Sequence, residues 1–126
     1  MREEIRRIVG DEGAAELLVK KAMELGEDLR TKGLKMAQIR DVFDELRQIE
    51  SVWMRNPQQA IRRLHLLRPK LYYRKRRHSA LDPLVQALDI AVQEVVAVSS
   101  EDEMHKRFQR LKEFVEAVVA YHGGDR

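Results

Sequence analysis

Apolar residues recur every three or four positions along most of the chain, which is the spacing of one face of an α-helix. The pattern is clearest between Met36 and Met54, where the repeating apolar residues are Ile39, Val42, Leu46, Ile49 and Trp53. Similar segments span about 3–9, 14–32 and 83–98, with one more beginning at Pro57 and a last one after Ser100. The sequence therefore predicts an all-α fold, a compact bundle of five to six helices.

Proline, glycine and capping residues stand where these helices are expected to begin and end. Asn56-Pro57 supplies an N-cap followed by proline at the first helical position, and Asp82-Pro83 repeats the device. Ser100 with Glu103 has the spacing of a capping box for the last helix. Pro69 lies inside the fourth helix, where it should kink that helix or end it. The expected helix terminators are Gly10, Gly33 and Gly123.

The segment from Pro83 to Val98 is apolar on almost every side, with a narrow polar edge at Gln86, Asp89 and Gln93. A helix that is apolar nearly all round belongs in the centre of a bundle. Its Val-rich end is also compatible with a strand. We expect the central core residues to be Leu84, Leu88, Val92 and Val95.

Length and composition favour one globular domain over residues 1–126, in which residues 1–12 hold a loosely attached N-terminal helix. The chain has no cysteine, which excludes disulfides and thiolate metal sites. It contains no apolar run long enough to span a bilayer, and no signal peptide is recognisable. We expect a cytoplasmic protein that does not bind membranes.

Positive charge is concentrated in the seventeen residues from Arg62 to His78, which hold eight basic residues and no acidic one. The chain as a whole carries +3, so the other 109 residues carry −5. A basic stripe interleaved with aromatic residues, here Tyr72 and Tyr73, is typical of a site for RNA or DNA. A solvated helix face, or a surface that docks an acidic protein, explains the charge equally well. The basic residues are Arg62, Arg63, Arg68, Lys70, Arg74, Lys75, Arg76 and Arg77.

Helical spacing places four of these residues on one edge, over roughly 21 Å. This length matches several successive phosphates of a nucleic-acid strand. Arg68 and Arg76 flank the edge, and Tyr72 and Tyr73 could stack on bases or sugars. One of the two tyrosines is expected in the core, because adjacent helical residues point about 100° apart. The residues of the edge are Arg63, Lys70, Arg74 and Arg77.

No pattern in the chain predicts catalysis. The histidines are not spaced to share a metal ion, no glycine-rich loop could hold phosphates, and no serine is paired with a histidine in a pattern that suggests a nucleophile. We therefore expect no enzymatic activity, no cofactor and no metal.

Three segments together resemble a known family. They are Gly-Leu-Lys-Met-Ala-Gln-Ile-Arg at 33–40 with its continuation to Ile49, Leu-Leu-Arg-Pro-Lys-Leu-Tyr-Tyr at 66–73, and Phe-Val-Glu-Ala-Val-Val-Ala-Tyr-His-Gly at 114–123. In this order and spacing they resemble the small subunit of the type III-A CRISPR effector, the Csm complex. The resemblance covers the chain from about Ala14 onward.

The resemblance implies a small helical protein without enzymatic activity that serves CRISPR interference, a form of antiviral defense. Copies of such subunits stack head to tail in a filament beside the guide RNA and its target RNA, in contact with other subunits. The family's basic residues carry over to Arg40, Arg68 and Lys70. Met36-Ala37 departs from the hydroxyl residues expected to cap the third helix, and 73–77 is more basic than in the family.

Our first hypothesis is a non-catalytic, sequence-independent RNA-binding subunit that lines and stabilises the guide–target duplex and bridges neighbouring subunits. The alternative is a helical interaction scaffold whose basic helix docks an acidic partner. A small DNA-binding regulator is a third reading, but the helices on either side of Asn56-Pro57 look too long and too apolar for a helix-turn-helix. Self-association as a filament or a dimer is expected. The predicted RNA contacts are Arg40, Arg63, Arg68, Lys70, Arg74, Arg76 and Arg77.

Overall fold

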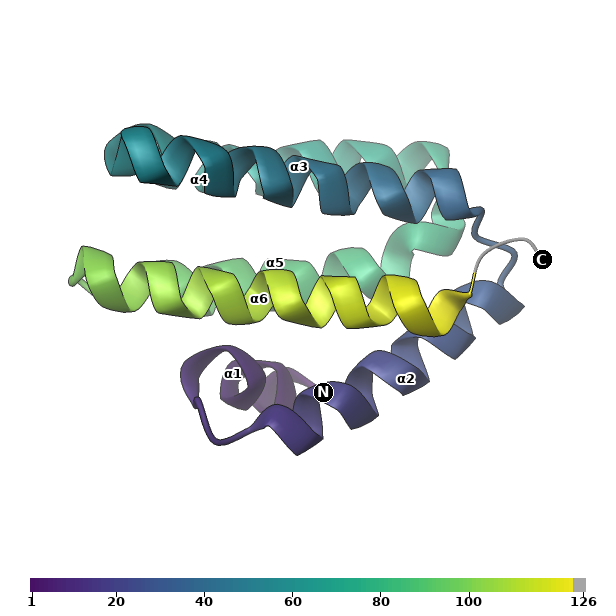
Figure 1. Ribbon diagram of the computed structural model, residues 1–126. Helices are drawn as coiled ribbons and strands as arrows, with labels where there is room; N and C mark the ends of the chain where they lie inside the picture. The colour runs from purple at the N-terminus through teal and green to yellow at the C-terminus, as the bar shows by residue number, and fades with distance from the viewer. Residues whose placement is uncertain (124–126) are drawn as a thin grey trace.

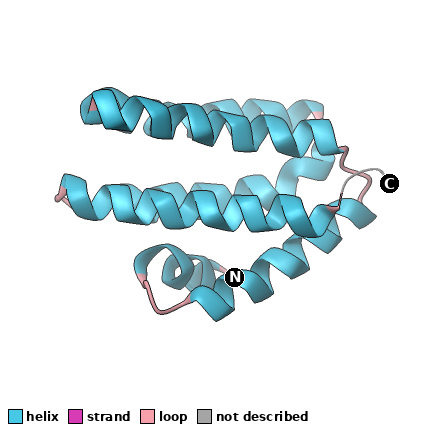
Figure 2. Ribbon diagram, in the orientation of Figure 1, coloured by secondary structure: helices cyan, strands magenta, loops and turns pink. Residues whose placement is uncertain are grey.

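The computed structural model describes residues 1–123, and these residues form six α-helices and one 3₁₀ turn without any strand (Figure 2). The all-α fold is therefore confirmed, and the Val-rich end of the fifth helix is helical. The elements are α1 (Arg2–Gly10), α2 (Ala15–Thr31), α3 (Met36–Arg55), α4 (Pro57–Arg77), the 3₁₀ turn η1 (Ser79–Leu81), α5 (Asp82–Val96) and α6 (Glu101–His122).

The helices are arranged in three layers (Figure 1). The pair α5 and α6 forms the middle layer, α3 and α4 cover one side of it, and α1 and α2 cover the other. This arrangement explains why α5 is so apolar. It packs against α1, α2, α4 and α6, so that little of its surface remains for water. The predicted centre is confirmed, since Leu84, Leu88, Val92 and Val95 are completely buried.

The layers containing α2 and α6 approach each other closely at Gly26. A Cβ atom at this position would lie 2.8 Å from Cβ of Tyr121 and 2.9 Å from the carbonyl oxygen of Val118. Real Cβ atoms do not come this close to a backbone atom, so only glycine allows the observed contact between the two helices.

The glycine terminators act as predicted at two helix ends. Gly33 has φ +83° after α2, where its N–H donates to the carbonyl of Arg30 and the next N–H, of Leu34, donates to that of Leu29. These two bonds form a Schellman motif. Gly123 has φ +72° after α6. Both positions lie in the left-handed region, which glycine adopts without strain.

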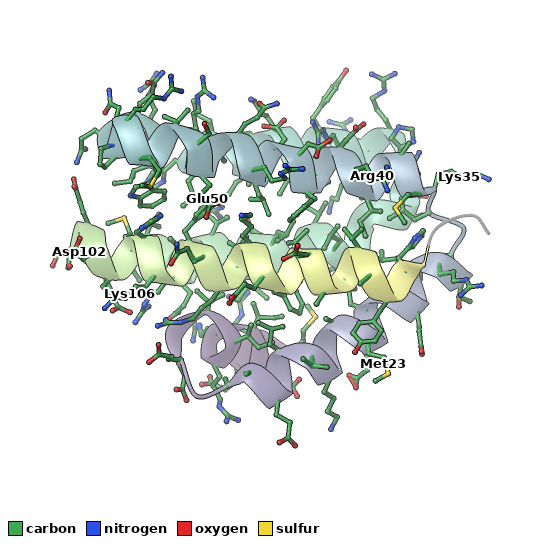
Figure 3. The ribbon with its side chains drawn as sticks, viewed as in Figure 1. Met23, Lys35, Arg40, Glu50, Asp102 and Lys106 are labelled. Carbon is green, nitrogen blue, oxygen red and sulfur yellow. The ribbon has the colours of Figure 1, made fainter. Side chains whose placement is uncertain are left out.

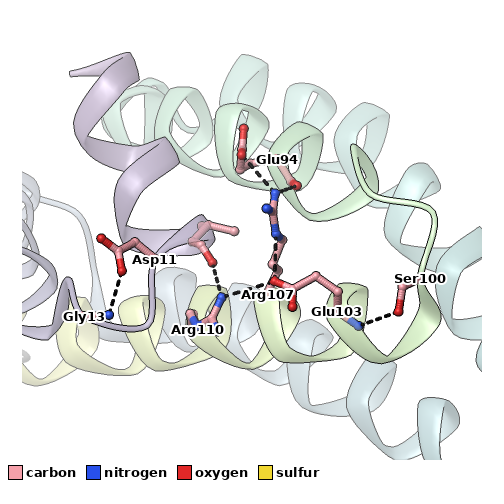
Figure 4. Close-up of polar contacts among 8 residues, drawn as sticks. Asp11, Gly13, Glu94, Ser100, Glu103, Arg107 and Arg110 are labelled. Carbon is pink, nitrogen blue, oxygen red and sulfur yellow. Dashed lines mark hydrogen bonds and ion pairs between the residues drawn. The ribbon is translucent and has the colours of Figure 1, made fainter.

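Two predicted caps differ from the structure. Leu81, not Asp82, is the N-cap of α5, because η1 already has helical dihedral angles and leads directly into the helix. At α6, Ser100 Oγ accepts from the N–H of Glu103 (3.2 Å) as predicted. The carboxylate of Glu103 contacts Arg107 and Arg110 instead of the N–H of Ser100, so the capping box is only half formed (Figure 4).

The N-terminal helix α1 contributes Ile5, Ile8 and Val9 to the core. Arg110 of α6 donates to the carbonyl oxygen of Val9 (2.9 Å), and Lys21 of α2 pairs with Glu4 (2.9 Å). Polar contacts from two helices thus hold the end and the side of α1, and Figure 4 shows the one made by Arg110.

Shortening a core side chain of α5 should destabilise the whole bundle. We expect Leu88→Ala to lower the free energy of unfolding by about 2–5 kcal/mol, because it leaves a cavity between the layers. The matched change Gln93→Ala, at an exposed position of the same helix, should alter it by no more than about 0.5 kcal/mol. Urea denaturation followed by circular dichroism measures both, and equal effects of the two changes would contradict the central position of α5.

Candidate nucleic-acid interface

The helix α4 carries all eight basic residues of the run between Arg62 and His78. It begins at Pro57, after Asn56, whose side chain accepts from the N–H of Gln59 (3.2 Å). Pro69 does not end the helix, which continues to Arg77. Pro69 has no backbone N–H to donate, but it lies on the exposed side of α4. Leu67 and Leu71, on either side of it, remain buried and hold the helix on the bundle.

One face of α4 is fully buried, and its orientation determines the direction in which each basic side chain of the helix points. It consists of Ala60, Leu64, Leu67 and Leu71, which are at most 1 % exposed. The basic residues therefore divide among the side facing α5, the side facing α3, and the outward face.

On the α5 side, two basic residues pair with carboxylates. Arg68 donates to Asp89 through two nitrogens, at 2.6 and 3.3 Å. Lys75 donates to Asp82 (3.0 Å) and lies 4.9 Å from the centre of the Tyr72 ring. The hydrogen bond from Lys75 lowers the pKa of Asp82 below its ordinary 3.8; a bond from Gln86 lowers it further, whereas burial opposes the shift. These contacts are intramolecular ion pairs, and both carboxylates reduce the local positive charge.

On the α3 side, Glu45 compensates two more cations. Its carboxylate lies 2.9 Å from Nη2 of Arg74 and 3.8 Å from Nζ of Lys70. Arg74 is only 31 % exposed, and its other terminal nitrogen, Nη1, is buried without a hydrogen-bond partner in the described part of the chain. The edge predicted to follow phosphates is thus interrupted in the middle by a carboxylate.

Four arginines of α4 have no carboxylate partner among residues 1–123. The eight cations of the helix contact three carboxylates in total, which leaves five positive charges uncompensated. Arg40, on α3, is also exposed and lacks an acidic partner within the same residues; it lies near the N-terminal end of α3 (Figure 3). The unpaired arginines of α4, all exposed, are Arg62, Arg63, Arg76 and Arg77.

Both tyrosines are exposed, Tyr72 by 56 % and Tyr73 by 61 %, so the expectation that one of them lies in the core is wrong. The position that points into the core is taken by Leu71. The next two residues therefore turn away from the core, Tyr72 toward the α5 side and Tyr73 toward the α3 side. There the Tyr73 ring lies 5.9 Å from the guanidinium of Arg77.

A groove of about 770 Å³ runs between α3 and α4. It brings together Lys70, Arg74 and Arg77 of the predicted site with Tyr73, but also with Asp41 and Glu45 of α3. Arg68 and Tyr72 lie in a separate depression beside α5. The predicted site residues therefore surround α4 and do not form one continuous patch.

Sequence reasoning left Arg62 out of the predicted contacts, although it belongs to the basic run and the structure leaves it exposed and unpaired. It also missed the two carboxylates of the groove. No local signal could have found them, because Glu45 is 29 residues from Arg74 and reaches it only through the packing of α3 on α4.

Within residues 1–123, no three His, Asp or Glu side chains are grouped so that they could hold a metal ion. His105 packs against the ring of Trp53, and Nε2 of buried His122 lies 2.6 Å from the carbonyl oxygen of Leu34. No helix in the same part of the chain is both long and apolar enough to cross a bilayer.

Comparison with known proteins gives one family. The family model Csm2 Type III-A matches residues 12–124, which is most of the chain and leaves out α1. Neither a curated protein nor a solved structure matches the chain.

The ion pair between Lys75 and Asp82 predicts a pKa change. In Lys75→Met, the pKa of Asp82 should rise toward 3.8, and NMR titration of the carboxyl carbon measures it. Because folding lowers this pKa, the pair stabilises the protein above the unfolded-state pKa, and the effect is lost as the pH falls through the folded-state value. The stability difference from wild type should therefore shrink on acidification. Lys20→Met, at an exposed position of α2, is the control, and an unchanged Asp82 pKa in Lys75→Met would contradict the pair.

Proposed function

Because the chain belongs to the Csm2 type III-A family and is a small subunit of the type III-A Csm complex, we propose that it binds RNA along α4 without reading its sequence. The observation that carries this proposal is the set of exposed, uncompensated arginines on α4, in a chain whose net charge is only +3. The basic run on α4 carries +8, whereas the other 109 residues of the chain together carry −5.

The mode of binding follows from the chemistry of these groups. Arginine at an exposed helix face neutralises phosphates and releases counterions, which gives affinity for any RNA strand. Recognition of sequence would come from pairing between guide RNA and target RNA, as in guided effectors generally. We assign the contact first to Arg62, Arg63, Arg76 and Arg77, with Arg40 on the neighbouring helix, and secondarily to the carboxylate-paired Arg68, Lys70 and Arg74.

In this role the subunit lines the guide–target duplex, bridges neighbouring subunits of the complex, and associates with further copies of itself. It acts in the cytoplasm, without catalysis and without a cofactor. The family is one of structural small subunits, in keeping with this role. Several copies along one RNA would multiply modest single contacts through avidity.

A scaffold role is the second candidate. Its support is that α4 already holds carboxylates with good ion-pair geometry, as in the two-nitrogen contact between Arg68 and Asp89. An acidic surface of another subunit could engage the unpaired arginines in the same way. Such an interface would form with fixed stoichiometry and would not respond to RNA.

The two candidates differ in their dependence on salt. Neutralising Arg62, Arg63 and Arg76 together (R62Q/R63Q/R76Q) should weaken binding of unrelated RNA sequences about equally. The slope of log affinity against log salt should become shallower by about 2, since each phosphate contact on a single strand releases roughly 0.7 counterions. Fluorescence anisotropy at several salt concentrations, with the free subunit and the assembled complex, measures both quantities.

The matched control removes the same charge elsewhere. Arg7, Lys20 and Lys106 are exposed, lie on α1, α2 and α6, and have no acidic partner within residues 1–123. R7Q/K20Q/K106Q should leave the salt slope nearly unchanged. If neither variant changes RNA affinity, while the α4 variant loses a protein contact in the complex, the scaffold role is correct and RNA binding by α4 is not.

A further inference from the structure

The groove between α3 and α4 differs in character from the outward face of α4. One wall is apolar and aromatic, formed by Leu66, Pro69 and Tyr73. The α3 wall carries Asp41 and Glu45. Its volume of about 770 Å³ lies within the range of roughly 300–1,000 Å³ typical of small-molecule sites.

The charges in the groove do not suit a phosphate. Lys70 and Arg74 are already held by Glu45, at 3.8 and 2.9 Å, and Asp41 adds a second carboxylate. The lining holds three cations and two carboxylates, so its net charge is only +1, and Arg77 is its only cation without a carboxylate partner within residues 1–123. Carboxylates instead accept hydrogen bonds from amino and hydroxyl groups, which bases and riboses offer.

Tyr73 provides the surface against which a base could stack. Its ring is 61 % exposed and lines the groove, with the guanidinium of Arg77 5.9 Å from its centre. Tyr72 is similarly exposed and also contacts a cation, but it lies beside α5, outside this groove. The two adjacent tyrosines therefore differ in surroundings and hardly at all in exposure.

From this combination we infer that the groove holds an unpaired nucleobase of RNA, stacked on Tyr73, with donors of the base or its ribose facing Asp41 and Glu45. The inference rests on the proposed function, because the arginines of α4 must first hold the strand. A base inside a duplex is already stacked and paired. The groove would thus take a base from a single strand, or one that stands out of the guide–target duplex.

A double-mutant cycle between protein and RNA tests the stacking. The probes are a single-stranded RNA and an oligonucleotide of the same length with the sugar-phosphate backbone but no bases. Tyr73→Ala should weaken binding of the intact RNA roughly 5- to 150-fold, the range found for base–aromatic stacking. It should weaken binding of the abasic strand less than twofold and leave the salt slope unchanged, since no phosphate contact is lost.

Tyr72→Ala is the matched control, and it should leave both affinities within twofold of wild type. Equal losses on intact and abasic strands, or equal losses for the two tyrosines, would overturn the inference. So would a loss of another subunit from the complex at unchanged RNA affinity, which would identify the occupant as a protein side chain. If instead the proposed RNA binding by α4 were wrong, R62Q/R63Q/R76Q would leave the salt slope unchanged, which distinguishes that failure from failure of the stacking inference.

Discussion

The burial of α5 and α6 between two covering layers is the constraint on which the rest of the structure depends. Because α5 is apolar on nearly all sides, helices must cover it on both faces, and α4 does so through Leu64, Leu67 and Leu71. Those three side chains fix the rotation of α4 about its own axis. The rotation in turn decides which cations meet carboxylates of α3 and α5 and which face water.

The basic helix α4 therefore presents two kinds of surface, one with ion-paired cations and one with unpaired arginines. Its sides form ion pairs with Glu45, Asp82 and Asp89, which hold the charges of Lys70, Arg74, Lys75 and Arg68 against the bundle. The four arginines without a carboxylate partner in residues 1–123 lie toward its outward face and its α3 side, and all are exposed. Exposed ion pairs of this kind contribute little to stability, typically less than about 1 kcal/mol each. The ion pairs on the two sides of α4 matter chiefly because they reduce the part of the helix surface whose positive charge is free to attract a polyanion.

Periodicity predicted the helices and the centre of the core because both depend on local spacing: the apolar stripe of α3 and the all-round apolar character of α5 are visible within each segment. The family resemblance, confirmed by the match over residues 12–124, came from three short motifs. What the sequence could not predict depends on packing between distant segments. Examples are the contact of Glu45 with Arg74, the exposure of both tyrosines, and the turn that replaces Asp82 as a cap.

The central claim is that RNA lies along the exposed arginines of α4, and NMR tests it most directly. In a titration of the isotope-labelled chain with a short single-stranded RNA, chemical shifts should change for the side chains of Arg62, Arg63, Arg76 and Arg77 and for the walls of the α3–α4 groove. Exposed residues of α1 and α2 should not respond. Perturbations that cluster on α2 and α6, or that are absent at saturating RNA in low salt, would contradict the account.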